Sequence, residues 1–446
     1  MINVDLKLDL SRSNAYFNEA CRYSPGGAPD AKGWERDLFY IERAKGNRLW
    51  DLDGNEYIDY NAGAGPIILG HSEDELDEVV IETIRNVGVQ VAQPHTLEVE
   101  LTKKLREIIP GAEQSVFCNA GTDTLQYAVR MARTYTGRQK VVKFEGGYHG
   151  WADGLAISTN PSLDAAGPGS SPNAIPDTSG VLPAILENTI VLPYNDLDAA
   201  SERLEREKRD IACVIVEPIV HGHAILPRPG FLKGLQELCN SCDIPLVLDE
   251  IITGFRHDLG GLQKKWGIEA DMACYGKSMA NGYVISAVTG KQKYMSTLSP
   301  DGPAFLSGTY NGNPVSSAAT LKTIEILGRD GFYERLYGLG DLLRDGINQV
   351  IEQLAINAVC YGYGSTWGIF FDRTIPSNYR DVAFHNEAGG SAKGAAYARH
   401  MLNHGIFIQP SRPARAYLYA AHTEEDVQRT VDAAASFFTD HQTALR

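Results

Sequence analysis

The sequence predicts an α/β protein whose mostly parallel sheet is covered by helices on both faces. Short, nearly continuous apolar runs are typical of strands that are buried on both sides. Such runs occur at 141–144, 211–216, 245–248 and 272–275. Apolar residues also recur at helical spacing, as in Leu97, Leu101, Leu105 and Ile108, and again in Leu125, Val129 and Ala132. The alternation of these two patterns favours parallel strands joined by helices.

The two ends of the chain have a different pattern. Asp53-Gly54 separates two short strand-like runs, which is a hairpin signal. After about residue 320 the chain predicts a helix, then strands around Val359 and 368–371, then helices to the end. We therefore expect three segments: part of a small α+β domain at 1–70, a large domain at 71–319, and the rest of the small domain at 320–446.

Composition restricts the class of protein. The 446 residues are 43% hydrophobic and 22% charged, as in a globular protein, and a formal net charge of -15 argues against nucleic-acid binding. No apolar run is long enough to span a bilayer, and the polar N-terminus does not resemble a signal peptide. We expect a cytoplasmic protein with reduced cysteines.

Three predicted strands end at residues whose side chains can take part in chemistry. Glu217 follows 211–216, Asp249 follows 245–248, and Lys277 comes shortly after 272–275. Ligands gather at the carboxyl ends of strands in open parallel sheets, so we expect these side chains at one site. Lys277 lies among small residues and is a candidate nucleophile toward an aldehyde, although a lone lysine is more often a surface residue. Asp249 is suited to pair with a pyridinium nitrogen, with a helix-capping carboxylate as the alternative.

Two glycine-containing segments are candidates for ligand binding. Gly121 and Thr122 begin a predicted helix and offer backbone N–H groups to a phosphate, although a plain N-cap is the alternative. Tyr148 and His149 lie between glycines, which leaves room for a flat ring to stack; a core aromatic at a turn is the alternative. His221 and His223 lack a third ligand at a motif spacing, so no metal site is predicted.

Taken together and in this order, the motifs resemble the class III aminotransferases of fold type I, which use pyridoxal 5'-phosphate (PLP), and most of all their glutamate-1-semialdehyde aminomutase-like branch. The likeness covers almost the whole chain. Its most specific motifs are Phe117-Cys118-Asn119-Ala120-Gly121-Thr122, Phe144-Glu145-Gly146-Gly147-Tyr148-His149-Gly150, Leu248-Asp249-Glu250-Ile251-Ile252-Thr253-Gly254-Phe255-Arg256 and Gly308-Thr309-Tyr310-Asn311-Gly312-Asn313-Pro314.

The resemblance implies a seven-stranded sheet in the large domain and a role for each motif residue. Lys277 would form the Schiff base with PLP and move a proton, and Asp249 would pair with the pyridine nitrogen. Ile251 and Tyr148 would pack on the two ring faces, while Gly121 and Thr122 hold the phosphate. Thr309 would reach the phosphate of the neighbouring subunit in a homodimer. The remaining cofactor-site residues implied are His149 and Glu217, and a proline-rich segment at 158–180 would correspond to a loop that gates the pocket.

The sequence departs from the aminomutase pattern at three places. Ala28-Pro29-Asp30-Ala31-Lys32-Gly33 replaces a segment that handles the substrate carboxylate, Ala64 replaces a tryptophan, and Ala414 replaces a glutamate. Ala64 is expected to widen the pocket. We expect Arg412 or Arg415 to hold the substrate carboxylate instead, since a guanidinium binds carboxylates in bidentate fashion; solvated arginines are the alternative.

The sequence therefore predicts a PLP-dependent aminotransferase that moves an amino group from an amino donor to an oxo acceptor. The donor expected is an amino acid, including a β-amino or bulky aromatic one. An aminomutase or racemase on the same scaffold and an amino-sugar or aminoglycoside aminotransferase are the alternatives within the fold. A dinucleotide-dependent oxidoreductase and a non-catalytic binding protein are the alternatives from other classes, and the absence of a glycine-rich dinucleotide fingerprint argues against the oxidoreductase.

Overall fold

The computed structural model describes residues 2–27, 39–409 and 415–446, which form two compact units. The first unit comprises Met1–Glu73, Glu334–Ile375 and His385–Arg446, and the second comprises Asp74–Tyr333 and Pro376–Phe384. The predicted boundary at residue 320 falls inside helix α10 (Pro314–Leu327), which lies wholly in the second unit.

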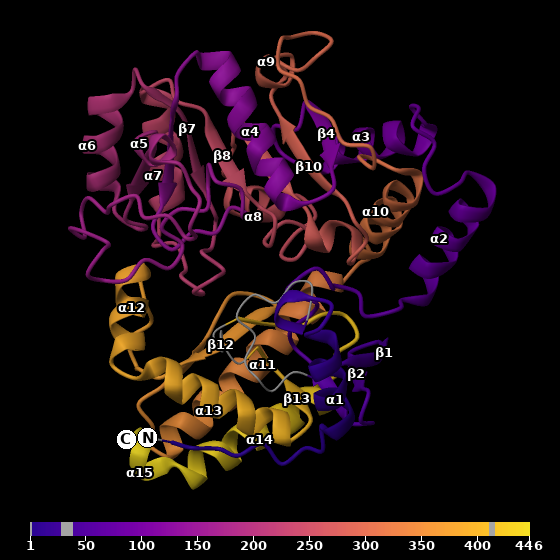
Figure 1. The fold of residues 1–446 in the computed structure, drawn as a ribbon, viewed down its shortest axis with the longest axis vertical. Coiled ribbons are helices and arrows are strands. Elements are labelled where there is room, and N and C mark those ends of the chain that lie inside the picture. Colours follow the sequence, from indigo (N-terminus) through magenta and orange to yellow (C-terminus); the bar gives the residue numbers. More distant parts are fainter. Residues whose placement is uncertain (1, 28–38, 410–414) are drawn as a thin grey trace. The chain divides into compact units, whose positions relative to one another are not determined.

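A seven-stranded sheet forms the centre of the second unit (Figure 1). Its strands, in spatial order, are β4 (Gln114–Cys118), β10 (Ser286–Gly290), β9 (Met272–Tyr275), β8 (Leu246–Asp249), β7 (Ile211–Val216), β5 (Lys140–Phe144) and β6 (Thr189–Leu192). Only β10 runs antiparallel to its neighbours. The predicted α/β class with a mostly parallel sheet is confirmed.

Helices cover both faces of this sheet. Residues of α4 (Gly121–Thr136) pack in one core cluster with the odd-numbered residues of β5 and β7, such as Val141 and Ile215. Phe231 of α7 (Phe231–Ser241) packs edge-on against Phe144, which alternation places on the opposite face of β5. Burial on both faces explains why the strands are continuous apolar runs rather than alternating ones.

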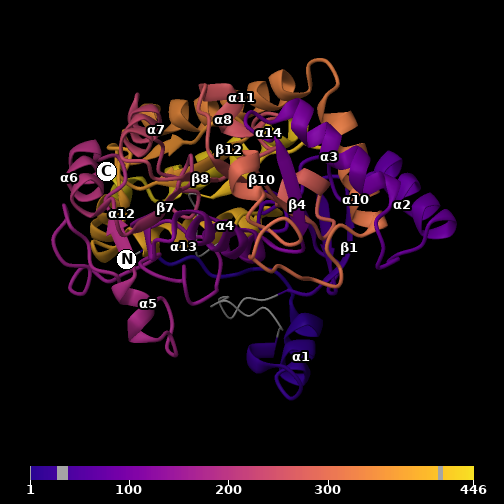
Figure 2. The same ribbon diagram turned by 90° about the horizontal axis from the view of Figure 1, so that it is seen from above.

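The other helices of the second unit flank this core. Figure 2 shows α6 on the β7 side of the sheet, and α2, α3 and α10 on the β4 side. Their bounds are α2 (Asp74–Asn86), α3 (Thr96–Ile108), α5 (Pro183–Glu187), α6 (Leu197–Glu207), α8 (Gly261–Trp266) and α9 (Gln292–Met295), with a 3-10 turn η2 at Lys277–Ala280. The helical spacing of Leu101, Leu105 and Ile108 is confirmed, since all three are buried on α3.

The first unit contains two small sheets packed with helices. One sheet has the order β1 (Ile41–Lys45), β2 (Arg48–Asp51), β3 (Glu56–Asp59) and β13 (Ile406–Phe407); the other has β11 (Val359–Tyr361), β12 (Thr366–Phe370) and β14 (Ala416–Tyr417). The antiparallel β2–β3 pair confirms the predicted hairpin. The helices are α1 (Ser11–Ala20), most of α11 (Phe332–Gln353), α13 (Gly390–Asn403), α14 (Glu424–Asp440) and α15 (Gln442–Leu445), after a 3-10 turn η1 at Pro25–Gly27; α12 (Tyr379–Glu387) is shared between the units.

The proline-rich segment at 158–180 contains no helix, and hydrogen bonds join its two ends to each other. Ile157 forms a bridge with Pro176, and the Thr159 N–H donates to Asp177 Oδ1 at 2.8 Å. Across the described ranges of the chain, no helix combines the length and the apolar character needed to cross a bilayer.

Candidate active site

The carboxyl ends of three adjacent parallel strands bring the predicted residues to one edge of the sheet. Val216 pairs with Leu248, and Asp249 pairs with Cys274, so β7, β8 and β9 end side by side. Glu217 directly follows β7 and is 6% exposed, and Asp249 is the last residue of β8 and is 5% exposed. Lys277 comes two residues after β9 and is half-buried. The structure thus brings together the three strand-end residues that the sequence singled out.

Lys277 adopts an unusual backbone conformation. Its φ is +47°, in the left-handed region that residues with a Cβ seldom occupy, and it follows Gly276 in extended backbone. Strained backbone of this kind is often found at functional positions. A Cβ on Gly276 would lie 3.3 Å from the Ile251 side chain, so the glycine leaves space beside Lys277 for that side chain.

Asp249 is held by His149, a contact between residues 100 positions apart. His149 Nδ1 lies 2.7 Å from Asp249 Oδ2, and the Ile251 N–H donates to Asp249 Oδ1 at 3.1 Å. Burial lowers the pKa of His149, although the Asp249 charge opposes this shift. A neutral ring with its proton on Nδ1 donates this hydrogen bond and leaves the negative charge on Asp249. The sequence predicted His149 in a ring-stacking segment and did not predict this pairing.

Glu217 binds two backbone amides. Its Oε1 accepts from the Tyr148 N–H at 2.8 Å and its Oε2 from the His221 N–H at 3.1 Å. Burial and the nearby Asp249 charge raise the pKa of Glu217 to about 8, and the charge of Lys277 acts in the opposite direction. Glu217 therefore fixes the loop that carries Tyr148. The charges of Asp249 and Lys277 both act on its carboxyl group.

The first backbone N–H groups of α4 have no side-chain cap among the described residues. The N-cap residue is Ala120, whose side chain cannot accept a hydrogen bond. Gly150 lies directly beside this point, because a Cβ there would stand 2.5 Å from Thr122 Oγ1. The Thr122 hydroxyl accepts from the Trp151 N–H at 3.4 Å. Gly121 and Thr122 thus form a cradle suited to an anion.

Ile251 lies between the start of α4 and the turn that carries Lys277. A Cβ on Gly121 would lie 3.2 Å from the Ile251 side chain, close to the value for Gly276. Ile251 is thus placed to pack against a ring bound between these elements. Tyr148, the predicted partner on the other ring face, is 38% exposed.

Thr309 is exposed and lies in the loop before α10, where its carbonyl accepts a hydrogen bond from the Gln90 side chain. The prediction that it reaches a neighbouring subunit stays a prediction.

Two predicted substrate residues meet in the first unit. Arg415 Nη2 donates to the Ala64 carbonyl at 3.1 Å, and its Nε donates to the Tyr417 hydroxyl at 2.7 Å. Ala64 has a left-handed backbone with φ +68°. Arg412, Ala414 and 28–33 lie outside the described residues.

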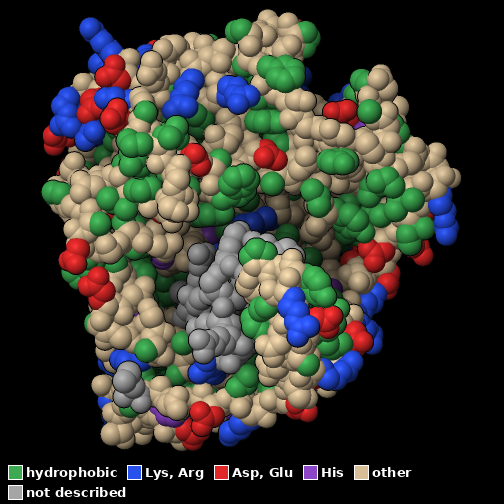
Figure 3. Space-filling model, viewed as in Figure 1, with side chains coloured by type: hydrophobic (Ala, Val, Ile, Leu, Met, Phe, Trp, Pro, Cys, Tyr) green, Lys and Arg blue, Asp and Glu red, His purple; other side chains and the backbone are tan. Residues whose placement is uncertain are grey.

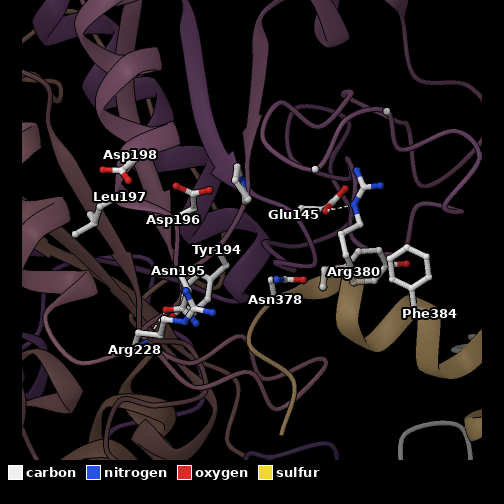
Figure 4. A pocket seen from close by; sticks show the side chains of 14 residues that line it. Glu145, Tyr194, Asn195, Asp196, Leu197, Asp198, Arg228, Asn378, Arg380 and Phe384 are labelled. Carbon is white, nitrogen blue, oxygen red and sulfur yellow. Dashed lines mark hydrogen bonds and ion pairs between the residues drawn. The ribbon is translucent and has the colours of Figure 1, made fainter. Parts of the chain in front are cut away.

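A separate cavity of about 780 Å³ opens at the carboxyl ends of β5 and β6 (Figure 4). Arg380 of α12 reaches across to Glu145, with Nε 2.7 Å from Glu145 Oε2. The second nitrogen of the guanidinium, Nη2, donates to the Ala166 carbonyl at 2.7 Å. This arrangement ties the 158–180 segment to the residue that follows β5.

One residue at the site was not predicted. Lys143 of β5 is fully buried, and its Nζ donates to the carbonyls of Gly147, at 2.8 Å, and Ile157. Its only signal in the sequence is a charge inside the apolar run 141–144.

Comparisons with known proteins agree with this geometry. A family model described as aminotransferase class-III matches residues 31–433. The chain is 38% identical over 427 residues to the glutamate-1-semialdehyde 2,1-aminomutase of Methanopyrus kandleri, covering 95% of this chain and 96% of that one.

Solved structures with the same fold include two transaminases. One is an omega-transaminase from Sphaerobacter thermophilus, with a TM-score of 0.89 and 31% identity over 96% of this chain and 97% of that one. The other is a β-phenylalanine aminotransferase from Variovorax paradoxus, with a TM-score of 0.84 and 30% identity over 98% of this chain and 96% of that one.

Proposed function

The chain belongs to the class III aminotransferases, in their glutamate-1-semialdehyde aminomutase-like branch and with PLP as cofactor, and on this premise we propose that it moves an amino group within one carbon skeleton. The M. kandleri relative, an aminomutase matched over nearly its full length, supports this assignment. Intermolecular transfer, which the sequence favoured first, becomes the second candidate.

The residues present fit PLP. The cofactor carries a phosphate, an aldehyde and a ring nitrogen, and the site offers a partner for each. The uncapped α4 start suits the phosphate, Lys277 the aldehyde, and buried Asp249 the ring nitrogen. When bound, PLP supplies an electron sink for the carbanion formed at the substrate carbon.

The chain's own groups then have distinct tasks. The Lys277 amine would hold the cofactor aldehyde and would move the proton at the substrate carbon. Asp249 keeps the ring nitrogen protonated because its negative charge is buried and is not neutralised by His149. Ile251 and Tyr148 would pack on the two faces of the ring. Glu217 fixes the Tyr148 backbone.

Arg415 and Ala64 support a carboxylate-bearing substrate. Arg415 is held by Ala64 and Tyr417, so its guanidinium has a defined orientation. A pre-oriented guanidinium loses less entropy when it binds a carboxylate. The proposed role of Arg415 in binding a substrate carboxylate applies equally to an aminomutase and to an aminotransferase.

A homodimer completes the proposal. Six apolar side chains between residues 81 and 99 are at least 37% exposed, namely Ile81, Ile84, Val87, Val89, Val91 and Val99. Figure 3 shows hydrophobic side chains gathered on the face of the second unit near α2 and α3. A contiguous exposed apolar patch marks an interface, and a second copy would also bring the exposed Thr309 to a neighbouring phosphate cradle.

The second candidate, transfer between two molecules, is favoured by the two transaminases with 30% and 31% identity. Product analysis separates the candidates. The purified enzyme is given glutamate 1-semialdehyde without any oxo acceptor, and products are identified by mass spectrometry and NMR. An isomer of unchanged mass with a displaced amino group supports the aminomutase reaction. Turnover of amino acids that requires an added oxo acid would instead support the aminotransferase reaction and contradict the aminomutase proposal.

A further inference from the structure

A single peptide bond beside the active site is held from both ends by buried ionisable groups. The carbonyl of Gly147 accepts from Lys143 Nζ at 2.8 Å, and the N–H of the next residue, Tyr148, donates to Glu217 Oε1 at 2.8 Å. Lys143 is 0% exposed and Glu217 is 6% exposed. The ammonium donor forms a charge-assisted hydrogen bond, which is stronger than a neutral one.

The position of Lys143 follows from strand alternation. Val141 and Lys143 lie on the face of β5 that α4 covers, and Lys143 is the last residue of this face before the strand ends. Within the described part of the chain, Lys143 makes no ion pair within 4.0 Å. Its nearby acidic groups are Asp177, Glu217 and Glu145. Asp177 accepts from Thr159, and Glu145 pairs with Arg380 (Figure 4).

A buried ammonium whose hydrogen bonds go to carbonyls is costly to keep. Burial lowers the pKa of Lys143 to about 8, because removal from water disfavours the charged form, although nearby carboxylates oppose this shift. A methionine of similar length would fill the same space without this penalty, and replacing buried charges by apolar residues is often neutral or stabilising. The burial of this charge is therefore weak evidence for a purely stabilising role of Lys143.

The peptide that Lys143 holds leads into Tyr148 and His149, the residues proposed to face the cofactor. Tyr148 and His149 follow directly, and His149 holds Asp249 at 2.7 Å. The same ammonium also binds the Ile157 carbonyl, while the Thr159 hydroxyl, which donates to Asp177, lies 3.3 Å from the Gly147 carbonyl. Lys143 thus joins the cofactor loop to the start of the 158–180 segment.

We propose that Lys143 is a positioning residue, which with Glu217 fixes the Gly147–Tyr148 peptide and so orients Tyr148 and His149 toward bound PLP. Pre-orientation removes an ordering cost from cofactor binding. The inference rests on PLP as the cofactor and is independent of which substrate is turned over.

The test compares three variants of the full chain. Lys143→Met removes the charge and the donors, and Lys143→Gln keeps a neutral donor. Thr159→Val removes a neutral hydroxyl that donates to Asp177 and lies 3.3 Å from the same carbonyl, and it leaves Lys143 in place. For each, the PLP dissociation constant, the induced circular dichroism of bound PLP and the melting temperature of the cofactor-free protein are measured.

We expect Lys143→Met to weaken PLP binding at least tenfold and to diminish the induced circular dichroism, while the melting temperature stays equal or rises. Lys143→Gln should fall between this variant and the wild type, and Thr159→Val should stay within threefold of the wild type. Unchanged binding and dichroism in Lys143→Met would overturn the inference. So would a loss of binding that accompanies an equally large loss of stability. If the methionine variant does not fold, unchanged binding and dichroism in Lys143→Gln overturn the inference.

These outcomes are distinct from failure of the proposed function. An enzyme without amino-group transfer but with the expected series of PLP affinities would contradict the proposed reaction and leave the role of Lys143 standing.

Discussion

His149 and Asp249 form a buried hydrogen bond of 2.7 Å that joins the loop after β5 to the end of β8. Because burial lowers the pKa of His149, the ring is neutral near pH 7 and orients the carboxylate without cancelling its charge. His149 Nε2 is buried and has no hydrogen-bond partner among the described residues. Asp249 is thereby left as the anion available to a ring nitrogen.

Asp249→Asn keeps the size of the side chain and removes its charge. We expect turnover to fall by about 100-fold or more, which is about 2.7 kcal/mol of transition-state stabilisation, because the ring nitrogen loses its charged partner. Steady-state kinetics check this expectation. His149→Asn, which leaves the carboxylate charged, serves as a comparison and should cost less. Equal losses in both variants would show that orientation, not charge, is what Asp249 supplies.

Lys277→Ala removes the amine that binds the cofactor. We expect the visible absorbance of lysine-bound PLP to disappear and turnover to fall by about 1000-fold or more, because no other described lysine lies at a strand end beside Asp249. Absorbance spectra and activity assays of the purified variant test this. Lys233→Ala, at an exposed position on α7, is the control and should match the wild type. Retained turnover in Lys277→Ala would refute the site.

Glu217 predicts a pH dependence of stability in the cofactor-free protein. Burial raises its pKa to about 8 from the ordinary value of 4.5, so between these pH values the folded chain holds a proton that the unfolded chain releases. This residue therefore lowers stability as the pH rises from about 4.5 to about 8, with no further change above.

Glu217→Gln cannot titrate, so its melting temperature relative to the wild type should increase steadily across this window and then level off. Calorimetry from pH 5 to pH 9 measures the difference. Exposed Glu237→Gln is the control and should give a constant difference. A flat profile for Glu217→Gln would mean that Glu217 does not hold a proton in the folded state.

Arg415→Ala should raise the KM of a carboxylate-bearing substrate by roughly 10- to 100-fold, as expected for a lost charge-assisted hydrogen bond. An amine substrate without a carboxylate should be unaffected. Tyr417→Phe removes only the hydroxyl that orients Arg415 Nε, so a rise in KM of a few-fold is expected. Equal effects of Arg415→Ala on acidic and neutral substrates would rule out a carboxylate clamp.

Two substitutions that introduce negative charge into the exposed apolar patch test the predicted dimer. Val89→Asp combined with Val99→Asp places two carboxylates in the exposed apolar patch, and we expect sedimentation to change from a two-chain to a one-chain species with loss of activity. Leu342 is 47% exposed in the first unit, and Leu342→Asp is the matched control. A wild-type sedimentation profile in the double variant would place the interface elsewhere.

Local patterns in the chain were enough to predict the central strands and the residues at their ends. Apolar runs and helical spacing depend on neighbours in the chain, so β5, β7, β8 and β9 and the positions of Glu217, Asp249 and Lys277 could be predicted. The resemblance to class III aminotransferases added the cofactor.

Contacts between residues far apart in the chain follow from the folded structure and not from local patterns. His149 pairs with Asp249 across 100 positions, Glu217 binds the Tyr148 amide across 69, and Arg415 binds the Ala64 carbonyl across 351. Periodicity specifies which face of an element is buried, but the contacts between loops depend on strand register and chain reversal, which no local pattern encodes. For the same reason the sequence did not predict a role for Lys143, whose buried ammonium group binds the Gly147 and Ile157 carbonyls in the folded chain.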